Sequence, residues 1–417
     1  MTTALGRLRW TVGLAAAVLA LGFAAAQGWW TWGLTDMFAF KPPYADTVAI
    51  LAAGEARHAG ADIYAIPNPY DPLGRPHVYG PGWLLTGTLG LTTHDAVWLG
   101  PLLAVLFTLT AALLLRPGGW REAGMGLLLL CSPPVMLGIS RGNNDLFIFL
   151  LLAAAAVLLV EPRRFAAAAG CAAVALAAVL KLYPFAALPA IALAAKRRSV
   201  GIVRFGVTLA VCLLVVWSER ADFQQAMHLA PDPRTTMAYG VKVLALTWAD
   251  LAGMRTVVSL GWGVGLLLPL LTLLPCRKAL WRAVTGDALT RVAFVLGASC
   301  WLFCFIAVRS FPYRFVLLIL PARFWLERSE GTQAAAGRRQ LFWWLIVAWF
   351  DPVKMAWAAR ARLDPTMHST DWTVFEAIIG VEQGITLVLS AALLVTVAST
   401  VLQTLRREPE VAPAPAG

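Results

Sequence analysis

Runs of about 20 apolar residues recur along the whole chain, and they constrain the fold more than any other feature of the sequence. A helix of this length crosses the hydrocarbon core of a bilayer. Hydrophobic residues make up 59% of the 417 residues and charged residues only 14%, which is more apolar surface than a soluble domain can bury. No segment shows the polar and apolar alternation of a β-barrel strand. The sequence therefore predicts an all-α, polytopic integral membrane protein.

The apolar runs predict about twelve spans in a single transmembrane domain at 1–405. The sixth and tenth runs are short, and we expect them to form re-entrant or tilted units. We interpret the first run as an uncleaved helix, although Ala24, Ala25 and Ala26 resemble a signal-peptide cleavage site. The predicted spans are 10–26, 94–115, 123–139, 146–160, 165–180, 183–195, 205–217, 257–274, 292–308, 315–326, 341–357 and 374–402.

The basic residues indicate how the chain is oriented in the membrane. The net charge is +11, and most cations fall in short loops on one side of the predicted spans, so membrane orientation explains them better than nucleic-acid binding does. This pattern predicts a multi-pass protein of the cytoplasmic membrane with both termini in the cytoplasm. The polar inserts at 27–93, 218–255 and 358–373 then face outward, and 406–417 is expected to be a disordered tail.

Cysteine and histidine spacing gives no sign of a metal site. The six cysteines lie in or beside apolar runs, which favours small buried side chains over a disulfide framework or a zinc site. His58, His77, His228 and His368 lack metal-ligand spacing, and we interpret them as surface or packing residues. We expect neither a metal nor a cofactor.

Three outward turns break the charge pattern because each carries a strong cation at a helix end. The turns are 140–145, 180–185 and 308–314. Ionisable groups at this depth usually have a partner, and a lipid phosphate is a natural one. The alternative is that the cations snorkel to the interface or pair with Asp145. The cations are Arg141, Lys181, Arg309 and Arg314.

The first insert is the natural place for chemistry outside the bilayer, because it is acidic and rich in aromatic residues and prolines. Asp46 is our first choice for a catalytic base and Asp36 our second. The alternative for Asp46 is that it only N-caps a helix at 47–58. In the turn at 140–145, Asn144 or Asp145 is predicted to cap the following helix, to bind sugar hydroxyls, or to do both.

These residues resemble a known family, the GT-C class of membrane glycosyltransferases. Within it, the chain looks like the polyprenol-phosphate-mannose-dependent α-mannosyltransferases of glycosyltransferase family 87. Six positions depart from the usual motifs of that family: Thr47, Ile50, Gly80, Asn143, Leu182 and Phe311. The resemblance is carried by Asp46, by Gly60, Asp62 and Tyr64, by 77–81, by 142–147, by 181–184 and by 310–313.

The resemblance implies a GT-C-like helical bundle whose outward first loop contains short juxtamembrane helices. It also implies an enzyme that transfers a sugar, mannose in that family, from a polyprenyl phosphate to an acceptor hydroxyl. Asp46 matches the catalytic aspartate of the family. The donor has a good leaving group, so one base and a set of cations are enough for an inverting displacement. The expected partners are the lipid-linked donor, a lipid or glycan acceptor and the membrane.

Several residues are predicted to bind the substrates of this reaction. Lys181 and Arg141, with Arg309 or Arg314, are expected to hold the lipid phosphate, and Asn144, Asp145 and Tyr79 to orient the sugar or lipid. Asn143, Tyr183 and Tyr313 complete the candidate set.

Two other functions fit a chain of this composition. A secondary transporter or lipid flippase predicts internal repeats and ionisable groups in the middle of the membrane. The sequence shows no clear repeat, and its exceptional charges cluster at the outward face. A scaffold without activity predicts that Asp46 and Lys181 can be replaced without loss of function.

Overall fold

The computed structural model describes residues 4–26, 42–230, 238–243, 255–307, 310–327, 331–363 and 369–406. Within these ranges the regular elements are all helices, and an isolated bridge pairs Tyr239 with Ser310. The predicted all-α class is confirmed. All six cysteines are free thiols.

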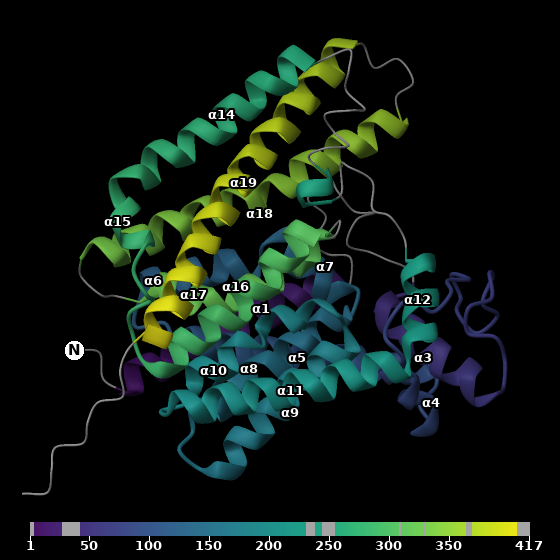
Figure 1. Ribbon diagram of the computed structural model, residues 1–417. Coiled ribbons are helices and arrows are strands. Elements are labelled where there is room, and N and C mark those ends of the chain that lie inside the picture. Colours follow the sequence, from purple (N-terminus) through teal and green to yellow (C-terminus); the bar gives the residue numbers. More distant parts are fainter. Residues whose placement is uncertain are drawn as a thin grey trace, which may run out of the picture.

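The first half of the chain alternates long helices with short helical turns (Figure 1). Pro133 and Pro134 begin α7, because proline suits a first helical turn and lacks the amide needed to continue α6. The elements are α1 (Ala4–Ala26), α3 (Ala45–His58), η1 (Pro81–Leu84), α4 (Leu85–Thr88), η2 (Thr93–Asp95), α5 (Ala96–Leu115), α6 (Trp120–Leu130), α7 (Pro133–Ser140), α8 (Asn144–Val160), α9 (Arg164–Leu180), η3 (Tyr183–Ala187) and α10 (Pro189–Ala194).

The second half ends in two long helices. Both predicted short spans, the sixth and the tenth, begin as a 3₁₀ helix, η3 and η7. The remaining elements are α11 (Arg198–Ser218), α12 (Arg220–Leu229), α14 (Arg255–Leu273), η6 (Leu274–Cys276), α15 (Arg277–Leu280), α16 (Ala288–Ala307), η7 (Pro312–Leu318), α17 (Ile319–Leu326), α18 (Thr332–Leu363) and α19 (Ser369–Arg406).

The described residues contain six helices that are long and apolar enough to cross a membrane, or seven if the bent pair α6–α7 counts as one span. Three further apolar helices, at 144–160, 164–180 and 183–194, are shorter. The chain is therefore a multi-pass membrane protein by the length and composition of its helices. The prediction of about twelve spans also counted these shorter helices and two more segments. One is 315–326, which the structure divides between η7 and α17, and the other is 341–357, which lies within α18.

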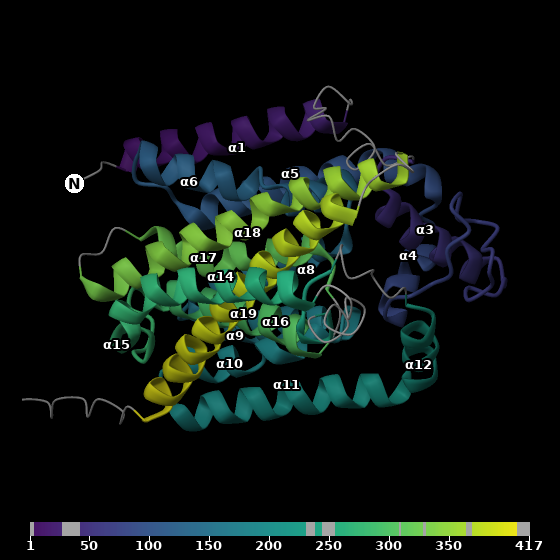
Figure 2. The ribbon, with the colours of Figure 1, turned by 90° about the horizontal axis from the view of Figure 1, so that it is seen from above.

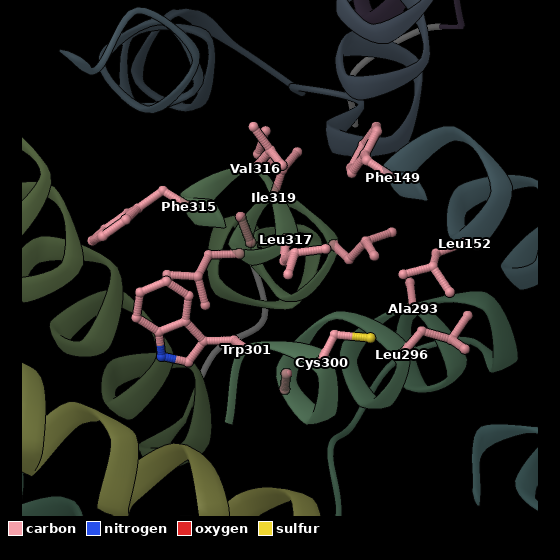
Figure 3. Packing of buried hydrophobic residues seen from close by; sticks show 14 of the residues in the cluster. Phe149, Leu152, Ala293, Leu296, Cys300, Trp301, Phe315, Val316, Leu317 and Ile319 are labelled. Carbon is pink, nitrogen blue, oxygen red and sulfur yellow. The ribbon is translucent and has the colours of Figure 1, made fainter. Parts of the chain in front are cut away.

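The core lies around α16 and the η7–α17 segment. Trp301 and Cys300 of α16 pack beside Phe315 and Leu317 of η7, and all four side chains are almost completely buried (Figure 3). The tenth predicted span is thus the apolar centre of the bundle and not a lipid-facing helix.

The helical bundle has two different ends. In both views α3, α4 and α12 gather at one end, which we call the insert end (Figure 1 and Figure 2). At the opposite end lies α15, and we call this the basic end after Arg277 and Lys278 of that helix. The first residues of α1 and the last residues of α19 also lie at the basic end. The first described helix therefore begins at the same end of the bundle at which the last one ends.

Helices α14 and α19 pack closely through glycine. A Cβ on Gly261 would lie 2.4 Å from the carbonyl oxygen of Ala377, and one on Gly265 would lie 2.1 Å from that of Val381. Small residues four positions apart let membrane helices approach each other in this way.

Replacing Gly265 by alanine is expected to destabilise the protein, because the new methyl group would meet the backbone of α19. Overpacking of this kind costs about 1–3 kcal/mol. The measurement is the Tm of the detergent-solubilised protein. Gly263→Ala on the same helix is the control, since a Cβ there has nothing within 4 Å and alanine favours the helix. Equal Tm changes in the two variants would contradict the packing argument.

Candidate active site

The turn between α7 and α8 docks onto the start of α3. The amide of Tyr44 donates to the carbonyl of Ser140 at 3.1 Å, and the amide of Asp46 donates to that of Arg141 at 2.9 Å. The Thr47 hydroxyl donates to the Gly142 carbonyl at 2.8 Å. The first amides of a helix lack partners within the helix, so the turn satisfies donors that would otherwise be unpaired. The first insert is therefore fixed to the bundle at the residues that flank Asp46.

Asp46 is buried in the first turn of α3 and does not cap it. The helix begins at Ala45, and its N-cap is Tyr44, which makes no side-chain capping bond. The alternative that Asp46 is only an N-cap is therefore wrong. The left-handed backbone of Tyr44, with φ of 56°, directly precedes the first helical residue, so the helix begins two residues earlier than predicted.

Three hydrogen bonds hold the Asp46 carboxylate. Arg141 donates from Nε to Oδ2 at 2.9 Å and from Nη2 to Oδ1 at 2.5 Å, and Asn143 donates from Nδ2 to Oδ2 at 2.5 Å. Bidentate arginine–carboxylate pairs combine strength with a defined orientation. Arg141, predicted as a phosphate ligand, is thus placed against Asp46, whose side chain is only 4% exposed.

Arg75 also contacts Asp46, and the sequence analysis missed it. Its Nη1 lies 3.5 Å from Asp46 Oδ1. Asp71 accepts from Arg75 Nε at 2.7 Å, and the carbonyl of Ala45 accepts from Nη2 at 2.6 Å. The only signal in the sequence was the spacing of Asp71 and Arg75 by four residues, which is also typical of an ordinary surface pair.

A second centre forms around Asp145, which is fully buried at the start of α8. Lys181 donates from Nζ to Asp145 Oδ1, and the Tyr183 hydroxyl donates to the same oxygen at 2.9 Å. Arg314 Nε lies 3.8 Å from Oδ2. The Arg314 guanidinium is oriented by a hydrogen bond from Nη1 to the Ser310 hydroxyl at 2.8 Å. Residues from α8, from the end of α9, from η3 and from η7 thus converge.

Several buried polar atoms of the second centre make no hydrogen bond. Among the residues that the structure describes, neither Asp145 Oδ2 nor Arg314 Nε has a hydrogen-bond partner, and both polar atoms of the Asn144 side chain are buried without one. Burying such groups without a hydrogen bond is unfavourable. A polar ligand at this centre would therefore find donors and acceptors that the protein does not use itself.

Tyr79 lies between the two centres. Lys181 Nζ lies 5.4 Å from the centre of its ring. Burial raises the pKa of Tyr79, and the nearby Asp46 carboxylate raises it further. The phenol therefore stays protonated and can donate a hydrogen bond.

The predicted cap of α8 is corrected by the structure. Asn143 is the N-cap, and its side chain accepts a hydrogen bond from the amide of Asp145 at 2.9 Å. Gly142, with φ of 55°, turns the chain so that this residue, and not Asn144 or Asp145, meets the first free amides.

Most predicted site residues come together at the insert end. Tyr313 belongs to η7 with Arg314, and its ring stacks on Phe311 at a centroid distance of 5.3 Å. Asp36 and Arg309 lie outside the described residues. The residues that the structure places at or beside the two centres are Asp46, Tyr79, Arg141, Asn143, Asn144, Asp145, Lys181, Tyr183, Tyr313 and Arg314.

The rest of the first insert is tied to the bundle through aromatic side chains. The Tyr64 hydroxyl donates to Asp222 Oδ1 of α12 at 3.0 Å, and Trp83 Nε1 donates to the carbonyl of Leu180 at 3.1 Å. His77 is 2% exposed and lies between the rings of Tyr64 and Tyr79. Its role is packing, one of the two roles predicted for it, and burial lowers its pKa to about 4.

Replacing Gly142 by alanine is expected to separate the turn from α3. The Cβ would lie 2.4 Å from Thr47 Oγ1, and the residue needs a positive φ. Gly60→Ala is the matched control, because Gly60 also has a positive φ but open space around it. We expect Gly142→Ala to cost about 1–3 kcal/mol more than the control. Tm measurements test this, and an equal loss in both variants would refute it.

Stability is expected to fall on acidification because of His77. Its pKa is near 6.5 in the unfolded chain and about 4 in the folded one, so the unfolded state takes up the proton first. The stabilising effect is complete above pH 6.5 and is lost as the pH falls toward 4. His77→Gln should show a smaller decrease in Tm between pH 7.5 and pH 5 than the wild type. His58→Gln, at an exposed position, should behave as the wild type.

Comparisons with known proteins identified no relative of the chain. No protein-family model, no curated protein and no solved structure matches the chain. The function must therefore be inferred from the residues of the two centres.

Proposed function

We propose that the protein is a glycosyltransferase that moves a sugar from a polyprenyl-phosphate donor to an acceptor hydroxyl, with inversion at the transferred carbon. One observation supports this most directly. The turn between α7 and α8 supplies Arg141 and Asn143 to the carboxylate of Asp46 and supplies Asp145 to Lys181, Tyr183 and Arg314. A candidate base and a candidate phosphate site are thereby built side by side from one short stretch of chain.

The charges assign different roles to the two centres. Around Asp46 the two carboxylates of Asp46 and Asp71 balance the two guanidiniums of Arg75 and Arg141. Around Asp145, among the described residues, a single carboxylate faces two cations, Lys181 and Arg314, which leaves one positive charge in excess. A departing lipid phosphate is anionic, so the second centre suits it and the first does not. In the proposal Arg141 therefore orients the base and does not bind the phosphate.

Asp46 is placed to accept a proton. A carboxylate offers about four lone-pair directions, and Arg141 and Asn143 occupy three of them. Arg75 is too distant, at 3.5 Å, to donate a good hydrogen bond. The remaining direction is available to an acceptor hydroxyl, whose proton Asp46 would remove as the oxygen attacks the anomeric carbon of the sugar. The phosphate leaves without protonation, so a second carboxylate is not required, in contrast to glycoside hydrolysis.

Three further features belong to the proposal. Asn144 and Tyr79 provide polar groups for sugar hydroxyls, since the side-chain amide of Asn144 has no partner among the described residues. The donor sugar is mannose, as the family resemblance implies. The insert end faces outward from the cytoplasmic membrane, because the basic clusters collect at the opposite end.

Replacing Asp46 by asparagine should abolish most of the transfer activity. A positioned general base contributes about 10²–10⁴-fold to the rate, and asparagine cannot accept the proton. The assay follows transfer of labelled sugar from polyprenyl phosphate to endogenous acceptors in membranes that contain the protein.

The matched control is Asp95→Asn, just after the first insert, which removes a carboxylate while asparagine can still accept the hydrogen bond from the amide of Thr92. Transfer at wild-type rate by Asp46→Asn would exclude this residue as the base. A complete lack of transfer by the wild type with any polyprenyl-phosphate sugar would overturn the proposed function itself.

A further inference from the structure

A groove at the basic end of the bundle, far from the candidate active site, runs between α14 and α18. It has a volume of about 470 Å³ and is lined by residues that include Leu271, Thr272, Arg338, Phe342 and Trp343. Helix α14 ends here at Leu273, within the last third of the candidate membrane span Ser259–Leu280. A lipid headgroup meets a membrane protein at this depth, where a span gives way to a polar loop.

The groove is basic, and none of its described lining residues is acidic. Arg339 donates from Nη1 to the carbonyl of Thr272 at 2.5 Å, which fixes its guanidinium at the end of α14. Trp343 Nε1 donates to the Thr272 hydroxyl at 2.8 Å. Arg338 is exposed beside them. Arg338 also borders the neighbouring cavity, which Glu122 and Glu327 line; neither glutamate lines this groove.

The rim of the groove is apolar on the side of the membrane span. Leu271 is 57% exposed and Phe342 is 53% exposed. In a bilayer such side chains contact acyl chains, because the hydrocarbon core is the medium around an exposed span. The same groove therefore combines two arginines with an apolar surface, as a phospholipid combines a phosphate with hydrocarbon chains.

We propose that this groove binds the headgroup of an anionic phospholipid. Arg338 and Arg339 bind the phosphate, since guanidinium groups match phosphate oxygens in geometry and charge. Leu271 and Phe342 contact the acyl chains. Basic pockets between membrane helices bind anionic headgroups in this manner. The site is independent of the proposed transfer reaction, because it lies at the other end of the bundle.

Photo-crosslinking tests the proposal. The full-length protein is reconstituted in phosphatidylcholine nanodiscs that contain a small fraction of phosphatidylglycerol with a photoreactive acyl chain. Labelled peptides are then identified by mass spectrometry. We expect label on peptides from 259–280 and 332–343, displaced by unlabelled phosphatidylglycerol and not by additional phosphatidylcholine. Arg338→Gln should lower this labelling about fivefold, from the loss of one cation near the headgroup.

Two further variants make the outcome decisive. Arg338→Lys keeps the charge and should retain most of the labelling. A double variant, Arg197→Gln with Arg198→Gln, removes two adjacent exposed arginines elsewhere and should leave it unchanged. In the described structure Arg338 makes no hydrogen bond, so its replacement is not expected to disturb the fold. The elution volume of each variant checks its folding. Three results would overturn the proposal. They are displacement of the label by phosphatidylcholine as well as by phosphatidylglycerol, unchanged labelling of Arg338→Gln, and a loss of labelling in the double variant equal to that of Arg338→Gln.

Discussion

The bidentate ion pair between Asp46 and Arg141 joins the first insert to the membrane bundle, and the rest of the site depends on it. Both partners are largely withdrawn from solvent, with side-chain exposures of 4% and 22%. Removing one partner of such a pair leaves an uncompensated buried charge, which is strongly destabilising. The backbone bonds around Ser140 and Gly142 align the two partners before any ligand arrives. The same ion pair therefore stabilises the fold and orients the proposed base.

This ion pair also explains why the two centres can differ in charge while sharing one turn. Arg141 is satisfied by Asp46, so it does not add to the positive charge around Asp145. Lys181 and Arg314 then exceed the single carboxylate they face. If Arg141 turned toward Asp145 instead, the Asp46 carboxylate would lose its main partner. One turn therefore keeps the proposed base and the proposed anion site apart, and no separate structural element is needed for each.

Sequence reasoning identified the charged residues that border long apolar runs, because a charge is unexpected there. Lys181 follows a long apolar run and Asp145 precedes one, so each was expected to have a partner, and they pair with each other. Arg75 was missed because its contact with Asp46 depends on how the loop after α3 folds back, and no local sequence pattern predicts that fold. The cap of α8 was misassigned because the dihedral angles of Gly142 decide it. The number of spans was hard to predict for a similar reason, since apolar composition does not distinguish a span from the buried 3₁₀ segment η7.

The position of the candidate site follows from where helices end. A membrane bundle can hold charged groups at low cost only where its helices meet the interface, and free backbone groups and helix dipoles are found at the same places. Asp46 and Asp145 occupy first turns, where a negative charge is favourable, and Lys181 follows the last turn of α9, where a positive charge is favourable. Each charge is therefore stabilised by its own helix before it pairs across the site. The proposed sugar transfer from a lipid phosphate would need a fixed base and a fixed anion site at the membrane surface, and helix ends are suited to hold both.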